Sequence, residues 1–429
     1  MRINLHTRLA ATYFGLLFLW SGSELRAADE QQLALVLRAQ TDFERLERAV
    51  GPELPDAARC EQSQAALLAV APRPEVAVIH FRKGYCTLAR AIITHSNKDF
   101  LEAAGEFDQA IKAWPDRTVK NAKNKPPEAV SSGLRILLST ARLETGPDAG
   151  DVDRYRQELS SAVDPPACSG SFMPTNECVS LLQTGRLWLG WIAIERNDLD
   201  RATRDLSGLA DSGWGHWTSG KQAFRERRYQ ESAAQFRQAV NVWTHAQNDP
   251  SGSLPARLAP QPDMGRVLTD WGGAQLLTAD YPGALATLDA AVKASAHPAR
   301  ALYLRARVKE LAGRTEEALA DYSLASRTAL ADAQDLASGE AHLYRGILLY
   351  RRHDFVHAED EFASALNFDI PDAMRPDAVA WRHLAAVAGG SCATSRPALE
   401  DSLAPVSPYF PKDEARLRAA TCPLTGPRV

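Results

Sequence analysis

The sequence predicts an all-α protein, a solenoid of antiparallel helix hairpins, and three observations lead to this fold class. A three-residue motif recurs along the chain, a small residue precedes most copies by twelve positions, and polar turn residues lie between the two. Self-similarity at a period of about 34 residues is typical of helical repeat arrays. Hydrophobic residues make up 45% of the 429 positions, which is enough for a folded core.

Each copy of the motif has a small residue, a bulky apolar residue four positions later, and a small or apolar residue three positions after that. These steps place all three side chains on one helix face, where the small residue lets a neighbouring helix approach. The copies are Ala103/Phe107/Ala110, Ser232/Phe236/Ala239, Ala284/Leu288/Ala291, Ala318/Tyr322/Ala325 and Ala358/Phe362/Ala365, with less regular ones at Ala202/Leu206/Leu209 and Tyr155/Leu159/Ala162.

The first helix of each hairpin is predicted from the small residue that lies twelve positions before the motif. The second helix would cross the first helix at this residue. These small residues are Ala91, Gly190, Gly220, Gly272, Ala306 and Gly346. The turn between the two helices is predicted from short polar stretches. They include Asn97-Lys98-Asp99, Arg196-Asn197-Asp198, Gly313-Arg314 and Arg352-His353-Asp354.

This pattern resembles the tetratricopeptide repeat (TPR) family, in the form found in exported bacterial proteins. The family's repeat carries a small residue in each helix, an aromatic residue near the start of the second helix and a terminal proline. The corresponding residues here are Phe100, Tyr229, Tyr281 and Phe355, with Pro115 as the proline. The resemblance covers residues 84–117 and 183–372, apart from an inserted loop at Asn248–Met264, and it implies a right-handed superhelical solenoid.

The N-terminal 27 residues are expected to be a secretory signal. Arg2 and Arg8 are followed by an apolar run from Leu9 to Trp20 and by small residues up to a cleavage site after Ala27. The run is short for a membrane span, although an uncleaved anchor is the alternative. We therefore expect a periplasmic or secreted protein.

The patterns divide the chain into five regions. Three further helices, near 30–48, 57–71 and 75–96, are expected before the repeats, because terminal units of an array are atypical. The regions are residues 1–27 as the signal peptide, 28–128 as an N-terminal helical region with one TPR-like unit at 84–117, 129–182 as a degenerate hairpin with a disulfide-closed loop, 183–372 as the TPR-like solenoid, and 373–429 as C-terminal capping helices and a disulfide-closed tail.

The six cysteines agree with export, because an oxidising compartment lets them pair. Cys60 and Cys86 both lie 13 residues from Arg73, and residues equidistant from the turn of an antiparallel hairpin face each other. Cys168 with Cys178 and Cys392 with Cys422 are expected to close a loop and the C-terminal tail. Free buried thiols are the alternative, and no C-x-x-C pair or Cys/His cluster favours a metal site.

Motifs for catalysis, cofactors and nucleic acids are not found. The formal charge of −4 with interspersed signs gives no basic block for a nucleic acid. Residues 215–221 have the spacing of a phosphate-binding loop, but Gln222 replaces the required Ser or Thr and no strand precedes them. His353 and His357 are four apart, but His353 is expected in a turn. No enzyme, cofactor or metal site is therefore expected.

The resemblance implies that the first helices of the repeats line a concave groove, in which the residues facing inward would bind a partner. The candidates are Trp188, Trp191, Trp214, Trp217, Lys221, Arg300, Tyr303, Arg307, Tyr344 and Arg351. Aromatic and arginine side chains are enriched at binding hot spots, and Arg307 and Lys221 favour acidic partner groups. Each Trp could equally pack between hairpins. The family's basic clamp for a terminal carboxylate is absent, because Thr269, Gly273, Leu343 and Ile347 occupy its positions.

The expected function is an exported scaffold or adaptor that binds a protein or peptide in this aromatic groove, in cell-envelope assembly or secretion. Two alternatives stay open from the sequence. The aromatic faces could stack on sugars of a glycan or envelope polymer, and an inserted loop such as Asn248–Met264 could carry an active site. The oligomeric state is not predicted.

Overall fold

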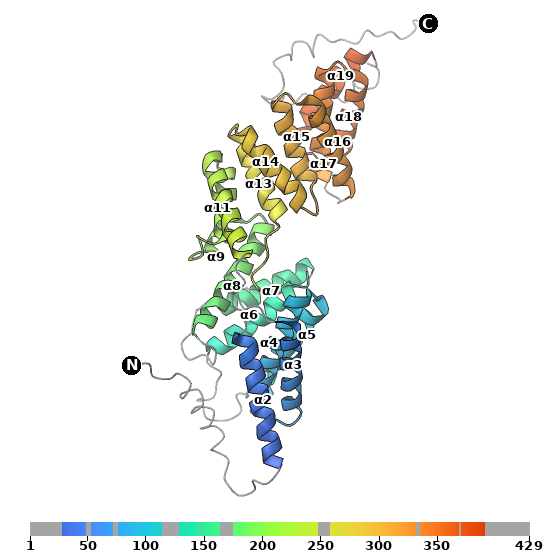
Figure 1. Ribbon diagram of the computed structural model, residues 1–429. Helices are drawn as coiled ribbons and strands as arrows, with labels where there is room; N and C mark the ends of the chain where they lie inside the picture. The colour runs from blue at the N-terminus through green and yellow to red at the C-terminus, as the bar shows by residue number, and fades with distance from the viewer. Residues whose placement is uncertain are drawn as a thin grey trace. The chain divides into compact units, whose positions relative to one another are not determined.

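The computed structural model describes nine stretches of the chain, which hold 17 helices and no strand (Figure 1). Over these stretches the all-α helical-repeat class expected from the sequence is confirmed. The chain divides into two compact units, Met1–Ile192 with Asp249–Pro260 and Ala193–Asn248 with Gln261–Val429. The stretches described are residues 28–48, 53–71, 76–113, 128–146, 148–163, 175–247, 258–331, 335–368 and 370–390.

Unit 1 is a run of helices in which the first five each pack on the next. The last helix, α8, lies against both preceding ones, because a Cβ added at Gly185 would lie 2.9 Å from Val163 Cγ1 of α7 and 3.4 Å from Ile136 Cγ2 of α6. The helices are α2 (Ala28–Arg48), α3 (Leu54–Leu68), α4 (Val76–Thr94), α5 (Asn97–Ala113), α6 (Glu128–Leu143), α7 (Ala149–Val163) and α8 (Thr175–Glu195), whose last three residues belong to unit 2.

Unit 2 contains four regular hairpins with one helix at each end. The first helices α10, α13, α15 and α17 lie side by side, and each second helix packs on the first helix of the next hairpin. The hairpins are α10 (Gly213–Arg225) with α11 (Tyr229–Gln247), α13 (Met264–Leu277) with α14 (Tyr281–Ala294), α15 (Ala299–Leu311) with α16 (Thr315–Ala331), and α17 (Asp335–Arg351) with α18 (Phe355–Asn367). The end helices are α9 (Leu199–Asp205) and α19 (Arg375–Gly389).

The two helices of a hairpin cross where a small residue faces a bulky one. A Cβ added at Gly220 would lie 2.6 Å from Phe236 Cδ1, and one at Gly346 would lie 2.7 Å from Phe362 Cε1. Gly272 faces Leu288 in the same way, at 2.5 Å from Cγ. The small–bulky pairing expected sixteen positions apart is therefore confirmed at these three hairpins.

The hairpin of α4 and α5 departs from this register. The residue that faces Phe107 is Gly84, whose added Cβ would lie 2.8 Å from Phe107 Cε1, and it lies seven positions before the predicted Ala91. The turn predicted at Asn97 is also wrong, because α5 begins at that residue and the turn lies at His95 and Ser96. An extra turn at the start of α5 therefore shifts where the two helices cross.

Gly220→Ala is expected to destabilise unit 2 by about 1–2 kcal/mol, because the added methyl group meets the buried Phe236 ring and overpacking outweighs the gain in helix propensity. Thermal unfolding of the purified protein measures this. Gly105→Ala is the control: nothing lies within 4 Å of a Cβ there, so the helix gains about 0.5–1 kcal/mol. Adding Phe236→Leu should restore part of the lost stability. Equal effects of the two glycine variants would contradict the crossing.

The turns that precede α9, α11, α14, α16 and α18 each hold one residue in the left-handed backbone region. Only one of the five is a glycine, although this conformation costs other residues about 1–2 kcal/mol. The residues lie nine positions before the bulky residue and are Asn197 (φ 58°), Arg227 (φ 61°), Ala279 (φ 61°), Gly313 (φ 75°) and His353 (φ 64°). The turns predicted around Asn197, Gly313 and His353 are therefore confirmed.

A polar residue immediately before the bulky one links the two helices of several hairpins. In α5, Glu106 lies 2.7 Å from both His80 Nδ1 and Lys83 Nζ of α4. In α18, Glu361 lies 2.7 Å from His342 Nδ1 and 2.5 Å from Arg345 Nη1 of α17. Asp321, Glu158 and Gln235 hold the same position and bond Arg305, Ser139 and His216 respectively. This repeat position was missed at the sequence level, although the residue type recurs at a fixed place.

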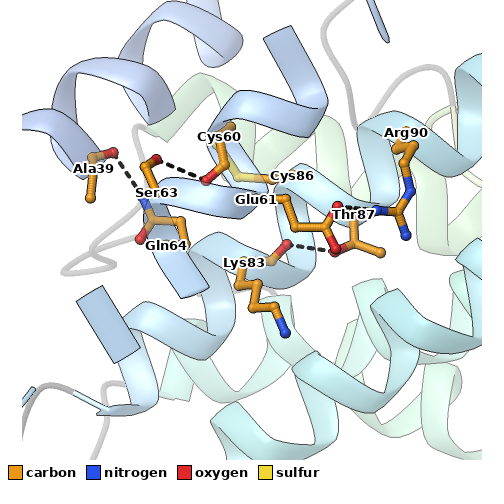
Figure 2. The surroundings of a disulfide bond; sticks show 9 residues. All are labelled: Ala39, Cys60, Glu61, Ser63, Gln64, Lys83, Cys86, Thr87 and Arg90. Carbon is orange, nitrogen blue, oxygen red and sulfur yellow. Dashed lines mark hydrogen bonds and ion pairs between the residues drawn. A yellow bond between two sulfur atoms is a disulfide. The ribbon is translucent and has the colours of Figure 1, made fainter. Parts of the chain in front are cut away.

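Cys60 of α3 and Cys86 of α4 form a disulfide, with their Cα atoms 5.8 Å apart (Figure 2). Both cysteines are fully buried. Beside them, Arg90 of α4 pairs with Glu61 of α3, and its Nη2 lies 3.1 Å from Asp99 Oδ1 of α5. The disulfide and this ion pair both join α3 to α4. The side chains of Cys168, Cys178, Cys392 and Cys422 lie outside the described residues, so their pairing stays a prediction.

A partly buried carboxyl group makes the stability of unit 1 depend on pH. Burial raises the pKa of Glu144, which directly follows α6, from 4.5 to about 7. The folded state therefore binds more protons than the unfolded state between pH 4.5 and 7, and stability falls as pH rises through this window. We expect a loss of roughly 1–3 kcal/mol between pH 4.5 and 8.

Urea unfolding at pH 5 and pH 8 tests this effect. Glu144→Gln cannot ionise, so it should be more stable than the wild-type protein at pH 8 and differ little at pH 5. Glu53→Gln, at an exposed carboxylate before α3, is the control for the removed charge. The prediction fails if both variants keep the same difference from wild type at the two pH values.

Candidate partner-binding surface

The first helices of unit 2 lie side by side, and we call one side of them the first-helix face, in which seven of the sixteen residues are buried. Each of α10, α13, α15 and α17 contributes four residues, counted from its small residue (Gly220, Gly272, Ala306 or Gly346). Two lie six and three positions before the small residue, and two lie one and five positions after it. These offsets lie on one side of a helix. The residues are Trp214, Trp217, Lys221 and Arg225; Arg266, Thr269, Gly273 and Leu277; Arg300, Tyr303, Arg307 and Leu311; and Glu340, Leu343, Ile347 and Arg351. Contacts between neighbouring helices hold it together.

The aromatic end of this face is core rather than surface. Trp214 and Trp217 are 3% and 1% exposed and pack with Trp243 of α11, at ring-centroid distances of 5.2 and 6.3 Å. In unit 1, Trp188 is 4% exposed and donates from Nε1 to the Leu258 carbonyl at 2.6 Å. Of the four predicted tryptophans, Trp191 alone is partly exposed, and its ring makes an edge contact with Trp188 at 5.2 Å.

Lys221 of α10 is paired with a carboxylate of α13. Asp270 Oδ2 accepts from Trp217 Nε1 at 2.9 Å and from Lys221 Nζ at 3.0 Å. The Trp217 ring also has two cations over it, Lys221 Nζ at 5.1 Å and the Arg266 guanidinium at 5.3 Å. Arg266 Nη1 in turn lies 2.6 Å from Glu195 Oε1. Lys221 is thus held by its own chain, where the sequence predicted a contact with a partner.

The centre of the face is a buried carboxylate shared by two arginines. Glu310 of α15 accepts from Arg307 Nη1 at 2.6 Å, from the Tyr322 hydroxyl at 2.7 Å and from Arg351 Nη1 of α17 at 3.0 Å. The Arg307 guanidinium also lies 3.9 Å above the Tyr344 ring. The Glu310 side chain is 6% exposed. This cluster joins two hairpins.

Arg307 and the tyrosines beside it, Tyr303 and Tyr322, keep their protonation states near neutral pH. Burial would lower the pKa of Arg307, but the neighbouring Tyr322 and the Glu310 carboxylate outweigh it and raise that pKa. Burial raises the pKa of Tyr322, and Glu310 adds to the shift. Burial, followed by Tyr344, likewise raises the pKa of Tyr303. The tyrosines therefore stay neutral hydroxyl groups, and Arg307 stays charged.

Arg300 crosses from α15 to α17 at the edge of this cluster. It pairs with the buried Glu340, and its guanidinium lies 5.0 Å from the Tyr303 ring centroid. The Tyr303 ring also contacts Tyr344, with centroids 5.8 Å apart. The Arg300 side chain stays 47% exposed and that of Arg351 60% exposed. These two predicted residues are the accessible cations of the α15–α17 part of the face.

Two exposed leucines belong to the face and were not among the predicted site residues. Leu277 and Leu311 are 49% and 50% exposed and hold the same place in α13 and α15, five positions after the small residue. The signal was available in the sequence, because Arg225 and Arg351 follow the small residues of α10 and α17 at the same distance.

The two motif-like stretches have structural explanations. Residues 215–221 lie inside α10, where Gly215 packs on the Leu209 carbonyl and Gly220 faces Phe236. His353 lies in the α17–α18 turn as expected, and His357 Nδ1 lies 2.8 Å from Asp354 Oδ1. Over the described stretches, no group of three His, Cys, Asp or Glu side chains could hold a metal ion. The same stretches contain no helix with the length and apolarity needed to cross a bilayer.

The hairpins of unit 2 combine a small–bulky crossing, neighbouring first helices and second helices that pack on the next first helix. The fold is TPR-like. No model of a known protein family matches the sequence, and no curated protein matches it. Three solved structures to which the chain is similar have 11–13% sequence identity to it.

One is a TPR protein from Parabacteroides merdae, 13% identical, covering 70% of this chain and 93% of its own, with a TM-score of 0.36. Yeast Tom70 is 12% identical, covers 87% of this chain and 99% of its own, and has a TM-score of 0.32. The TPR domain of P58(IPK) is 11% identical, covers 90% of this chain and 96% of its own, and has a TM-score of 0.29.

Proposed function

We propose that this protein is an exported TPR-like scaffold that binds a protein or peptide partner on the first-helix face of unit 2. The observation that carries the proposal is the arrangement of this face. Its buried carboxylates Glu310 and Glu340 hold arginines in place, while Arg300 and Arg351 keep about half of their side-chain surface exposed. Positioned, partly exposed arginines beside apolar side chains are typical of binding hot spots.

The arginines of the face keep donors for a partner. A guanidinium group has five N–H donors. Arg351 donates from Nη1 to Glu310, which already accepts from Arg307 and Tyr322. One carboxylate between two guanidinium groups leaves a positive charge on this part of the face. This charge supports a partner with acidic groups. We propose that Arg300 and Arg351 contact these groups, where the sequence had favoured Arg307 and Lys221.

The described residues favour a peptide over a sugar. Stacking on a sugar requires an accessible ring face, and Trp188, Trp214 and Trp217 are buried. The enzyme alternative depends on the inserted loop, of which residues 248–257 lie outside the described residues.

Site-specific photocrosslinking tests the proposed surface. A photoreactive amino acid replaces Leu311 on the first-helix face or, as a control, Leu324, which is 42% exposed on the second helix α16. In extracts of the source cell envelope, position 311 should give a protease-sensitive crosslinked product that position 324 does not give. Arg300→Glu should weaken it. Equal products at both positions, or a product resistant to proteases and sensitive to glycan hydrolases, would overturn the proposal.

Export and a role in cell-envelope assembly or secretion are part of the same proposal. The Cys60–Cys86 disulfide supports an oxidising compartment, and the predicted signal at residues 1–27 supports transport. A fusion of the first 30 residues to a leaderless β-lactamase tests transport directly. Resistance to ampicillin is expected, and sensitivity would place the protein in the cytoplasm.

A further inference from the structure

Four exposed side chains form a row across the first-helix face, which we call the Leu–Arg row. It consists of Arg225 of α10, Leu277 of α13, Leu311 of α15 and Arg351 of α17. Each follows the small residue of its helix by five positions, so the four hold equivalent places in consecutive hairpins. The leucines are 49% and 50% exposed, and the side chains of the arginines are 51% and 60% exposed.

The order of the row follows from the order of the helices. Because α10, α13, α15 and α17 are neighbours in that sequence, the two leucines lie in the centre and one arginine lies at each end. Phe224, which is 37% exposed, adds apolar surface beside Arg225. The row thus offers an apolar centre between two positive ends.

The spacing of the row selects an extended segment of a particular conformation. Packed helix axes lie about 8–10 Å apart, so equivalent side chains of neighbouring helices recur at about that distance. A polyproline II helix rises about 3.1 Å per residue with three residues per turn, which brings every third side chain to one face about 9 Å apart. In a β-strand the third residue points to the opposite face. Every third side chain of a polyproline II segment therefore matches one helix of the row.

We propose that the Leu–Arg row binds a polyproline II segment of a partner protein in which two apolar residues, three positions apart, are flanked three positions further out by carboxylates. The proposal rests on the proposed function and specifies the partner's chemistry. Charge complementarity requires an acid at each end, and the exposed leucines require apolar side chains between them.

The ion pairs that the row makes within its own chain do not prevent this binding. Arg225 Nη2 lies 3.1 Å from Asp200 Oδ1, and both side chains are at least half exposed. Such an exposed ion pair contributes little to stability and can exchange for a partner carboxylate. When Arg351 turns to a partner, Glu310 still accepts from Arg307 and Tyr322. Neither exchange leaves a buried charge without a partner.

Fluorescence anisotropy with a synthetic probe tests the proposal on the purified full chain. The probe is the labelled peptide Glu-Pro-Pro-Leu-Pro-Pro-Leu-Pro-Pro-Glu, which adopts the polyproline II conformation. Two control peptides replace both leucines with alanine or both glutamates with lysine. The first probe should bind, and each control peptide should bind at least about tenfold more weakly. Equal binding of all three peptides would overturn the proposal.

Variants of the chain locate the binding. Leu311→Ser and Leu277→Ser should each lower the affinity for the probe about tenfold, since each removes an apolar contact of a leucine. Leu324→Ser, at a similarly exposed leucine of α16, and Arg314→Gln, at an exposed arginine paired with Glu317, should leave the affinity within about twofold. A probe affinity unchanged by the row variants would overturn the proposal.

Reversing the charge of Arg225 and of one end of the peptide tests the contact at that end of the row through a gain of binding. The Arg225→Glu variant should bind the acidic probe more weakly. It should instead bind a peptide that carries lysine at one end and glutamate at the other. Of the two such peptides, with lysine first or last, only one should bind. Recovery with neither order would overturn the assignment of Arg225. Dimerisation of the chain that depends on concentration and is abolished by Leu311→Ser would also overturn the proposal, because a second copy of the chain would then occupy the Leu–Arg row.

The results separate this inference from the proposed function. If the crosslink at position 311 persists and depends on Arg300 while the row variants leave the probe unaffected, the scaffold function stands and the segment chemistry is wrong. If position 311 gives no more product than position 324 in extracts but the row binds the probe, the chemistry stands and the proposed function is wrong.

Discussion

Glu310→Ala is expected to lower the free energy of unfolding by about 3–5 kcal/mol, because it leaves the mostly buried Arg307 guanidinium without its carboxylate. Glu310 accepts from Arg307 at 2.6 Å and from the Tyr322 hydroxyl at 2.7 Å, and its side chain is 6% exposed. Tyr322 is fully buried, so its hydroxyl would also lose its acceptor. Urea unfolding of unit 2, followed by tryptophan fluorescence, measures the change.

Two variants distinguish a lost ion pair from lost packing. The double variant Arg307→Met with Glu310→Leu removes both charges and keeps apolar volume, so its stability should lie within about 1–2 kcal/mol of wild type. Glu317→Ala is the matched control, because Glu317 pairs with Arg314 where both side chains are about half exposed, so its effect on stability should be far smaller than that of Glu310→Ala. A Glu310→Ala effect as small as that of Glu317→Ala would contradict the role of the cluster.

Loss of the Cys60–Cys86 disulfide is expected to destabilise unit 1 by about 3.5 kcal/mol, the loop-closure value for a separation of 26 residues. The bond joins α3 to α4 at a fully buried position, so the reduced chain has more unfolded conformations open to it while its native contacts are unchanged. Urea unfolding with and without dithiothreitol measures the difference.

The double variant Cys60→Ala with Cys86→Ala controls for effects of the reductant. It should unfold at the same urea concentration as the reduced wild-type protein and should not respond to dithiothreitol. Peptide mapping without reductant, on protein isolated from its native compartment, should recover residues 60 and 86 in one linked fragment. Free thiols at both positions would contradict the disulfide and remove a support for export.

Several features of the fold could be predicted because they depend on neighbours in sequence. The face shared by Ser232, Phe236 and Ala239 follows from steps of four and three in one helix. The pairing of Gly220 with Phe236 follows from a short turn between two helices, and Cys60 with Cys86 from their equal distance to a turn. The register of α4 on α5 could not be predicted, because both Gly84 and Ala91 suit a crossing and the extra turn of α5 favours Gly84.

The candidate surface could be predicted only in part. Sequence periodicity identified the side of each first helix, including Arg300 and Arg351. It did not show which side chains on that side stay accessible, because their partners lie far along the chain. Trp188 donates to Leu258 seventy positions away, and Lys221 pairs with Asp270, which is 49 positions away.

The sequence by itself determined the helices, their pairing into hairpins and the repeat positions that share a face, since turn chemistry and the spacing of apolar residues are local properties. The tertiary structure alone decided what each position does. It packed Trp217 against Arg266 and Asp270 of the next hairpin, enclosed Glu310 between Arg307 and Arg351, and left Leu277 and Leu311 exposed. The physical reason is that burial and charge pairing depend on which hairpin is packed alongside, and one hairpin's sequence does not contain that information.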